Sequence, residues 1–295
     1  MNHFTIRDIE NLCGIKAHTL RVWEQRYKLF VPKRKESRHR VYDNDDLREL
    51  LRISFLYHKG HKISKIAELG PEQLHELVER SCARECDQEI FVHQLIEAGI
   101  DLDKERFEQT VNCLVLRLGL EKSIREVFYP FLERIGLLWM TNHVIPAQEH
   151  FVSHIIRKKI IMATDGIEMP NNNKPPVLIF APDGEFHEIP LLTANYFFRK
   201  YNNRTVYFGS NVSIGSLQYY LECHPVNCLY AHIITLLNDT CFDEYIFTLC
   251  RQFPGKKIIV SGPATRCIEN KPANLQVLCS LEEMIAFARE RGSAI

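Results

Sequence analysis

Positive charge is concentrated in the first 42 residues of the chain. Ten lysines or arginines occur there against four aspartates or glutamates, although the 295 residues together carry no net charge. Because a nucleic-acid backbone is a dense array of phosphates, a local cationic cluster binds it even when the whole molecule is neutral. The cluster is therefore suited to DNA, and a solvated basic face on a small helical domain is the alternative.

A histidine directly after a predicted strand is the second feature that could do chemistry. The apolar run 177–181 predicts a strand, and Glu185 and His187 follow it closely. Sheets built from alternating strands and helices bind ligands at the carboxyl ends of their strands. A neutral imidazole there can ligate a metal when an acceptor orients its other nitrogen, and the sequence does not identify that acceptor. Alternatively, His187 caps the following helix or bonds a neighbouring backbone group.

The residues around the cationic cluster indicate how it is presented. Residues 5–9 predict the start of a helix, Gly14 and Ile15 a turn, and residues 16–27 a second helix, which is the spacing of a helix-turn-helix. Pro32, the basic run 37–42 and an acidic helix start at 43–47 follow. This succession resembles the recognition helix, wing and following helix of the MerR family over residues 3–70.

The MerR resemblance implies that the second helix enters the DNA groove and that the wing holds phosphates. Trp23 and Tyr27 are as well suited to packing the small core as to touching DNA. The resemblance also implies a homo-oligomer on double-stranded promoter or operator DNA, because one small winged domain buries little surface. The predicted DNA-binding residues are Lys16, His18, Thr19, Arg21, Arg26, Arg34, Arg38, Arg40 and Tyr42.

The spacing after residue 185 resembles that of a cobalamin-binding family, whose pattern is D/E-x-H-x-x-G, then S-x-L, then G-G. Both gaps between these elements match, but Pro190, His232 and Ser261 replace Gly, Ser and the first Gly. The resemblance implies that His187 ligates the cobalt of cobalamin, with adenosylcobalamin as the expected form. The replaced positions normally line the channel for the displaced nucleotide tail, so their bulk argues against tail binding.

A tryptophan and a Glu-His pair mark the region before that domain. Trp139 is followed after nine residues by Glu149 and His150. Taken alone, a tryptophan in a helical protein is more often part of the core, and a Glu-His pair more often lies at the surface. Together with the His187 motif, the spacing resembles the helical cap of cobalamin-dependent photoreceptor regulators of the CarH type, which also carry a MerR-like N-terminus. The resemblance implies that Trp139, Glu149 and His150 cover the upper face of the corrin.

The elements that must position these residues indicate a multidomain α and α/β protein. We predict a winged helix-turn-helix domain over residues 1–75 and a helical bundle over 76–168, because apolar residues recur there every three or four positions. Residues 175–295 alternate apolar runs with helical stretches, which predicts a doubly wound parallel sheet of the flavodoxin-like or Rossmann-like kind. Prolines and asparagines over 166–176 predict a linker.

Composition and missing motifs narrow the function classes. The apolar runs are far shorter than the roughly 20 residues of a membrane helix, and no signal peptide opens the chain. The ten cysteines form no C-x-x-C pair, so reduced thiols in the cytoplasm are expected. We find no P-loop, no Ser-His-Asp pattern and no zinc-hydrolase spacing, so an enzyme is not expected.

The sequence thus predicts a DNA-binding transcription regulator. Its C-terminal modules would sense a ligand, which the resemblance suggests is adenosylcobalamin together with its response to light. The same modules would control oligomerisation and operator binding. The alternative is a MerR-like regulator with a degenerate sensor that binds no cobalamin and responds to a protein partner or another small molecule.

Overall fold

The computed structural model describes residues 4–29, 33–34, 40–84, 88–140, 145–170, 172–235, 242–267 and 271–293. The chain forms two compact units, Met1–Ile155 and Ile156–Ile295. Among the described residues, no helix is both long and apolar enough to cross a membrane.

The first unit is helical apart from one two-stranded sheet. Its elements are α1 (Ile6–Cys13), α2 (Ala17–Tyr27), β1 (Lys33–Arg34), β2 (Arg40–Val41), α3 (Asn44–His58), α4 (Ile63–Ile66), α5 (Pro71–Arg84), α6 (Gln88–Asp101), α7 (Lys104–Ser123), a π-helical turn (Ile124–Phe128), α8 (Tyr129–Met140) and the start of α9 (Pro146–Asp165). We call residues 4–69 the head and residues 71–155 the bundle.

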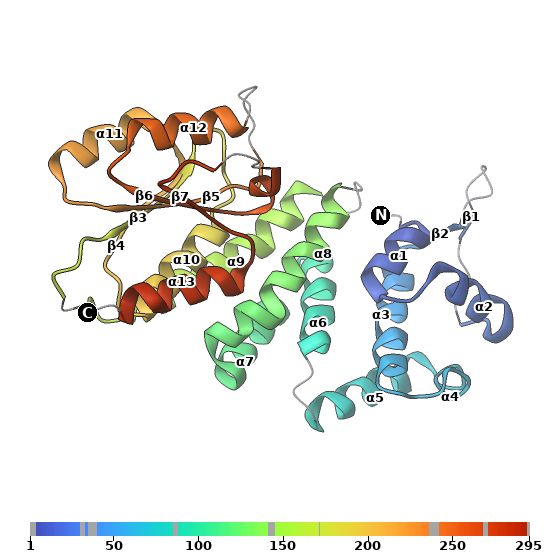
Figure 1. Cartoon of the computed structure of the whole chain (residues 1–295). Helices are drawn as coiled ribbons and strands as arrows, with labels where there is room; N and C mark the ends of the chain where they lie inside the picture. Colours follow the sequence, from blue (N-terminus) through green and yellow to red (C-terminus); the bar gives the residue numbers. More distant parts are fainter. Residues whose placement is uncertain are drawn as a thin grey trace. The chain divides into compact units, whose positions relative to one another are not determined.

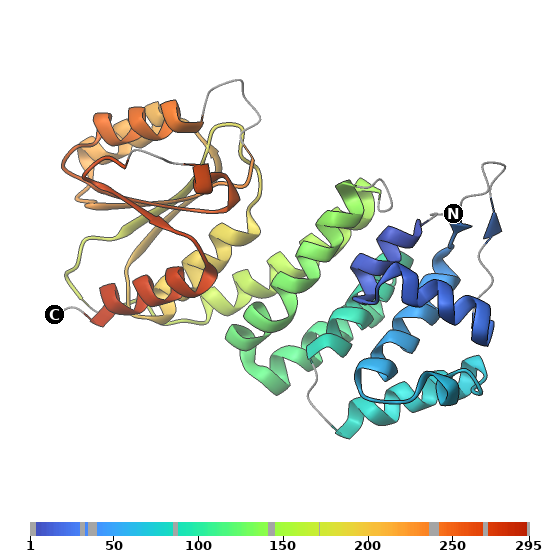
Figure 2. The same cartoon turned by 45° about the vertical axis from the view of Figure 1, so that its right-hand side comes forward.

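The head has the predicted helix-turn-helix and wing. Thr5 and Asp8 form a reciprocal capping box that starts α1, and Gly14 ends it with a φ of 68°, a conformation that glycine adopts without strain. Strands β1 and β2 pair antiparallel and form the wing, which Figure 2 shows in dark blue. The predicted turn and both predicted helices are therefore confirmed.

The described residues of the bundle form helices joined by short connections, as predicted. Gly119 interrupts α7 with a φ of 75°, where other residues are strained. Gly99 on α6 allows α9 to approach closely, since a Cβ atom there would lie 2.8 Å from a methyl carbon of Val152. Helix α3 of the head packs against α5 and α6, so head and bundle belong to one unit.

The second unit is the predicted doubly wound parallel sheet. After the end of α9 come β3 (Val177–Pro182), α10 (Ile189–Lys200), β4 (Thr205–Val212), α11 (Ile214–Cys223), β5 (Cys228–His232), α12 (Phe242–Gln252), β6 (Lys257–Ser261), a 3₁₀ turn (Pro263–Cys267), β7 (Leu275–Leu278) and α13 (Leu281–Ser293). The strand order is β4-β3-β5-β6-β7, and every pair is parallel.

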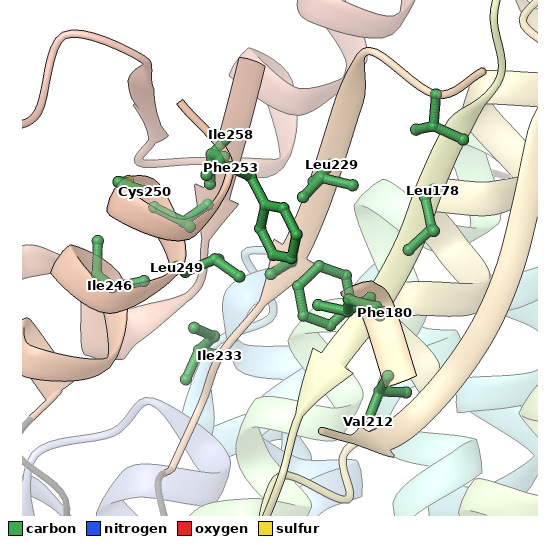
Figure 3. Close-up of a cluster of buried hydrophobic side chains, with 14 residues drawn as sticks. Leu178, Phe180, Val212, Leu229, Ile233, Ile246, Leu249, Cys250, Phe253 and Ile258 are labelled. Atoms are coloured by element: carbon green, nitrogen blue, oxygen red, sulfur yellow. The ribbon is translucent and has the colours of Figure 1, made fainter. Parts of the chain in front are cut away.

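Helices cover both faces of this sheet (Figure 1), with α11 and α12 on one face and α10 and α13 on the other. Figure 3 shows the core under α11 and α12, where Phe180 and Leu229 of the strands meet Ile246 and Leu249 of α12. Because both faces are buried, the strands are continuous apolar runs rather than alternating ones. This is the pattern from which the sheet was predicted.

Residues 166–176, predicted as a linker, contain no helix or strand in their described part. They are fixed to the second unit, since Arg199 donates to the carbonyl of Ile167 at 2.6 Å and Lys174 donates to the carbonyl of Gly292 at 2.9 Å. The two compact units divide within α9, before this segment. The division into domains at 1–75, 76–168 and 175–295 stays a prediction.

Candidate functional site

Helix α2 presents a cationic face at the surface of the head. The predicted DNA-binding side chains of Lys16, His18, Arg21 and Arg26 are exposed, and that of Thr19 is partly exposed. The opposite side of the helix is buried, with Leu20 and Trp23 only 1% and 4% exposed. An amphipathic helix of this kind is fixed by its apolar side and leaves its charges accessible to phosphates.

Helix α3 holds α2 and the preceding turn in place. The Trp23 ring packs edge-on against Tyr57 with 4.8 Å between ring centroids. The Ser54 hydroxyl donates to the carbonyl of Cys13 at 2.6 Å, next to the turn at Gly14. Trp23 therefore belongs to the core of the head. Of the two roles that the sequence allowed, packing the core and touching DNA, the structure shows the first.

One residue predicted to contact DNA is buried in the head. Tyr42 is 1% exposed, and its backbone pairs with Phe4 in both directions, at 2.8 and 2.9 Å. Its ring therefore packs in the head core. Arg34 and Arg40 are paired positions of β1 and β2. Their side chains and the whole of Arg38 lie outside the described residues, so their DNA contacts stay predictions.

One acidic side chain accompanies the cationic face of α2. The ammonium group of Lys16 lies 3.2 Å from Glu10 Oε1, and Glu10 also accepts a hydrogen bond from the backbone of Ala17. The hydrogen bonds from Lys16 and Ala17 lower the pKa of Glu10. Glu10 is therefore ionised at neutral pH and offsets part of the positive charge at the start of α2.

At the other candidate site, His187 lies on the loop between β3 and α10, at the carboxyl end of β3, as predicted. Its side chain is 52% exposed, and its Nδ1 lies 2.6 Å from Glu185 Oε1. Glu185 is completely buried, and its Oε2 accepts hydrogen bonds from the backbone N–H groups of Ile234 and Thr235, both at 2.7 Å. Glu185 is thus the acceptor that sequence reasoning did not identify.

The environment of Glu185 keeps it ionised. Burial by itself raises the pKa of Glu185, but hydrogen bonds from the His187 side chain and from the backbones of His187, Thr235 and Ile234 lower it to about 2. Beside an ionised carboxylate, Nδ1 of His187 is the protonated nitrogen, so metal ligation would use Nε2. The E-x-H spacing, with an acid two positions before the histidine, is the signal that could have revealed this pair.

The fold itself explains why this pair can form. The chain runs from β3 outward to β4 and then crosses back to β5, so the switch point of the sheet lies between β3 and β5. Glu185 follows β3, whereas Ile234 and Thr235 follow β5, and the carboxylate spans the switch point. Ligands of doubly wound sheets bind at this position. We call the carboxyl ends of β3, β5 and β6 the sheet edge.

A hydrogen-bonded cluster occupies the rest of the sheet edge. Nδ1 of His232 and the hydroxyl of Tyr230 lie 2.8 and 2.7 Å from Ser261 Oγ. Burial lowers the pKa of His232 to about 4, so this ring is neutral at pH 7. Gly262 follows with a φ of 106°, and a Cβ atom there would lie 2.2 Å from the carbonyl oxygen of Ile233. The backbone at Gly262 therefore lies close to the backbone of Ile233, and the side chains of this cluster lie beside it.

The three predicted cap residues lie in the bundle, on either side of residues 141–144. Trp139 is close to the end of α8, and 51% of it is exposed. Glu149 and His150 lie in the first turns of α9, where Glu149 accepts from Ser153 at 2.6 Å and its Oε2 lies 3.0 Å from His150 Nδ1. Ile145 is also 51% exposed. Both apolar side chains are thus accessible to solvent.

These residues fit one part of cobalamin and not another. His187, oriented by an ionised Glu185, has the chemistry of a metal-binding histidine with its supporting carboxylate and could hold the cobalt. The exposed ring of Phe186 beside it is an apolar surface that sequence reasoning missed. By contrast, His232 and Ser261 stand where the pattern of the resembling family has Ser and Gly, and their side chains bond to each other. Pro190 stands at the start of α10, as its fixed φ allows.

Comparison with known proteins bears on both sites. The MerR HTH family of regulatory proteins matches residues 4–73, and the B12 binding domain matches residues 92–163. The chain is 26% identical over 215 residues to the HTH-type transcriptional repressor CarH of Myxococcus xanthus, with 71% of each chain covered. It is 24% identical over 216 residues to the HTH-type transcriptional repressor CarA of the same organism, covering 72% of this chain and 70% of that protein.

A solved structure shares the fold. The monomethylamine corrinoid protein of Methanosarcina barkeri aligns with a TM-score of 0.56 at 13% identity, covering 70% of this chain and all of that protein. At this identity the likeness concerns the fold alone. Trp139, Glu149 and His150 lie within the range that the B12 binding domain matches, and His187 lies after it.

Proposed function

We propose that this chain, which carries a MerR helix-turn-helix domain joined to a B12-binding domain and is homologous to the CarH and CarA repressors, is a transcriptional regulator that senses cobalamin. The head binds promoter or operator DNA through the exposed face of α2 and the wing. The observation that carries the sensing role is the buried, ionised Glu185 that orients His187 at the switch point of the sheet.

The chain's own residues take distinct parts in this proposal. His187 would hold the cobalt through Nε2, and Glu185 would keep the ring in the required tautomer. Trp139, Glu149 and His150 of the bundle would contact the cofactor. Adenosylcobalamin, when bound, supplies a cobalt–carbon bond that light can break.

Regulation requires that the ligand favours one of two states of the protein. A ligand shifts such an equilibrium only by its different affinities for the two states. We propose that the states are oligomers of different size and that a homo-oligomer binds the operator, since one head buries too little surface for a specific complex. Size-exclusion chromatography with and without adenosylcobalamin, in darkness and after illumination, tests this step.

A second candidate function is favoured by the cluster of Tyr230, His232 and Ser261. Because Pro190, His232 and Ser261 replace the residues that line the tail channel in the resembling family, the domain is also suited to a sensor that binds no cobalamin and responds to a protein partner or another small molecule. DNA binding by the head is common to both candidates, so only a ligand experiment separates them.

The visible absorption spectrum of the full chain, purified after incubation with adenosylcobalamin in darkness, separates the two functions. We expect a bound corrin spectrum in the wild type and in the control His224→Ala, whose exposed ring on α11 bonds the carbonyl of Tyr220. His187→Ala should change the spectrum of the bound corrin or lose it. A colourless wild type would contradict the cobalamin proposal, and a spectrum unchanged in His187→Ala would contradict ligation.

A further inference from the structure

A cavity of about 470 Å³ lies within the first unit, between the head and the bundle. Helix α3 forms one wall, and α5, α6 and α7 of the bundle form the others. The volume is within the range of small-molecule sites, which are mostly 300–1,000 Å³. All lining residues belong to the first unit, so the cavity is separate from the sheet edge.

Among the described residues that line this cavity, two guanidinium groups face one carboxylate. Glu97 of α6 is 5% exposed and accepts a hydrogen bond from the guanidinium of Arg106 on α7 at 2.8 Å. The guanidinium of Arg52 on α3 lies 3.6 Å from the same carboxylate oxygen, which is an ion pair rather than a hydrogen bond. Two guanidinium groups thus share one carboxylate. A planar guanidinium is well suited to bind a further carboxylate.

A buried imidazole also lines the cavity. His93 is 5% exposed, and its Nε2 lies 3.2 Å from Glu89 Oε1 in an ion-pair contact without hydrogen-bond geometry. Its Nδ1 has no hydrogen-bond partner among the residues that the structure describes. Buried polar atoms are nearly always paired, because leaving one without a partner costs free energy. Both ring nitrogens are buried from solvent, so His93 contributes the surface of its ring to the cavity wall.

The remaining wall combines apolar side chains with the polar side chains of Gln94, Gln109 and Thr110. Leu51 and Phe55 of α3, Val78 of α5 and Ile90 of α6 face the same cavity as the polar groups. Three of these four side chains, Leu51, Phe55 and Ile90, are at most 3% exposed. A ligand that satisfies both kinds of wall carries an anionic group and an apolar body.

We propose that this cavity binds a small organic carboxylate with an apolar body. Arg52 and Arg106 bind the carboxylate, and the apolar side chains of the wall cover the rest. Because Arg52 belongs to the head and Arg106 to the bundle, the ligand contacts both parts of the unit. This site is additional to the proposed cobalamin site.

Isothermal titration calorimetry of the full chain with 2-naphthoate, and with its neutral counterpart 2-naphthamide, tests the proposal. We expect 2-naphthoate to bind and 2-naphthamide to bind at least tenfold more weakly. Arg52→Gln should weaken the binding of 2-naphthoate at least tenfold. Arg48→Gln is the matched control, because Arg48 also extends from α3 to an acid of the bundle, Asp101, but does not line the cavity. It should bind like the wild type.

A second variant does not depend on the ion pairs. Gln109 lines the cavity from the exposed side of α7, so Gln109→Trp should obstruct the opening, weaken 2-naphthoate binding at least tenfold and leave the helix content unchanged by circular dichroism. No binding of 2-naphthoate to the wild type, equal binding of 2-naphthamide, or full binding by a folded Gln109→Trp protein would each overturn the proposal.

Discussion

In the head, the side chains expected to meet DNA stand exposed on α2, whereas at the sheet edge the carboxylate behind His187 is completely buried. Lys16 has one acidic neighbour, Glu10, while Glu185 accepts hydrogen bonds from the backbones of three residues and contacts an imidazole. Both regions depend on charged side chains, which are exposed to solvent in the head and buried at the sheet edge.

This difference predicts how each region responds to substitution. Exposed charges act through a screened field, so each contributes a modest and nearly independent part of the affinity. A buried carboxylate is bonded to several groups at once, so removing it leaves all of them without a partner. A single substitution should therefore have a small effect on DNA affinity in the head, whereas a substitution of the buried carboxylate at the sheet edge should have a large effect on stability.

The largest effect is expected for Glu185→Ala. The variant leaves the N–H groups of Ile234 and Thr235 without their acceptor, so the free energy of unfolding should fall by about 3 kcal/mol. Urea denaturation followed by circular dichroism measures this. Glu222→Ala, which removes an exposed carboxylate of α11, is the control and should change stability little. Equal losses in the two variants would remove the contrast between regions.

Acid should abolish the contribution of Glu185. Its pKa is lowered to about 2 in the folded state, from an ordinary value of 4.5. A lowered carboxyl pKa stabilises the fold above the unfolded value, and this stabilisation is lost as the pH falls from about 4.5 towards 2. The difference of about 3 kcal/mol in unfolding free energy between wild type and Glu185→Gln should be constant from pH 8 to 5 and shrink below pH 4.5. A difference at pH 3 as large as the difference at pH 7 would refute this assignment.

In the head, Arg21→Ala should weaken binding to a DNA duplex by about tenfold, because one exposed contact is lost while the fold is kept. Arg40→Ala on the wing should in addition lower the slope of log affinity against log salt by about one. Fluorescence anisotropy at several salt concentrations measures both. Arg117→Ala, at an exposed position of α7 in the bundle, is the control. A loss as large for Arg117 as for Arg21 would show that α2 is not the interface.

The smallest effect should have the opposite sign. Glu10→Gln removes the charge that offsets Lys16, so duplex binding should strengthen by about two- to threefold at low salt and lose this gain at high salt. The same anisotropy titration measures it. Weaker binding by Glu10→Gln would indicate that the ion pair positions Lys16 rather than competing with phosphate.

The sequence alone determined the succession of elements and the exposed part of each candidate site. Capping residues, a turn glycine and apolar periodicity are local, so they predicted the helix-turn-helix, the bundle and the five strands. They also placed His187 on the loop after β3, because strand and loop are neighbours in the chain.

Only the tertiary structure decided which groups meet. Glu185 is held by N–H groups some fifty residues further along, His232 and Ser261 meet across paired strands, and the backbone pairing with Phe4 places Tyr42 in the core. The cavity beside Arg52 requires α3 to pack against the bundle. Local patterns specify which elements form, but burial and pairing between distant residues depend on how those elements pack.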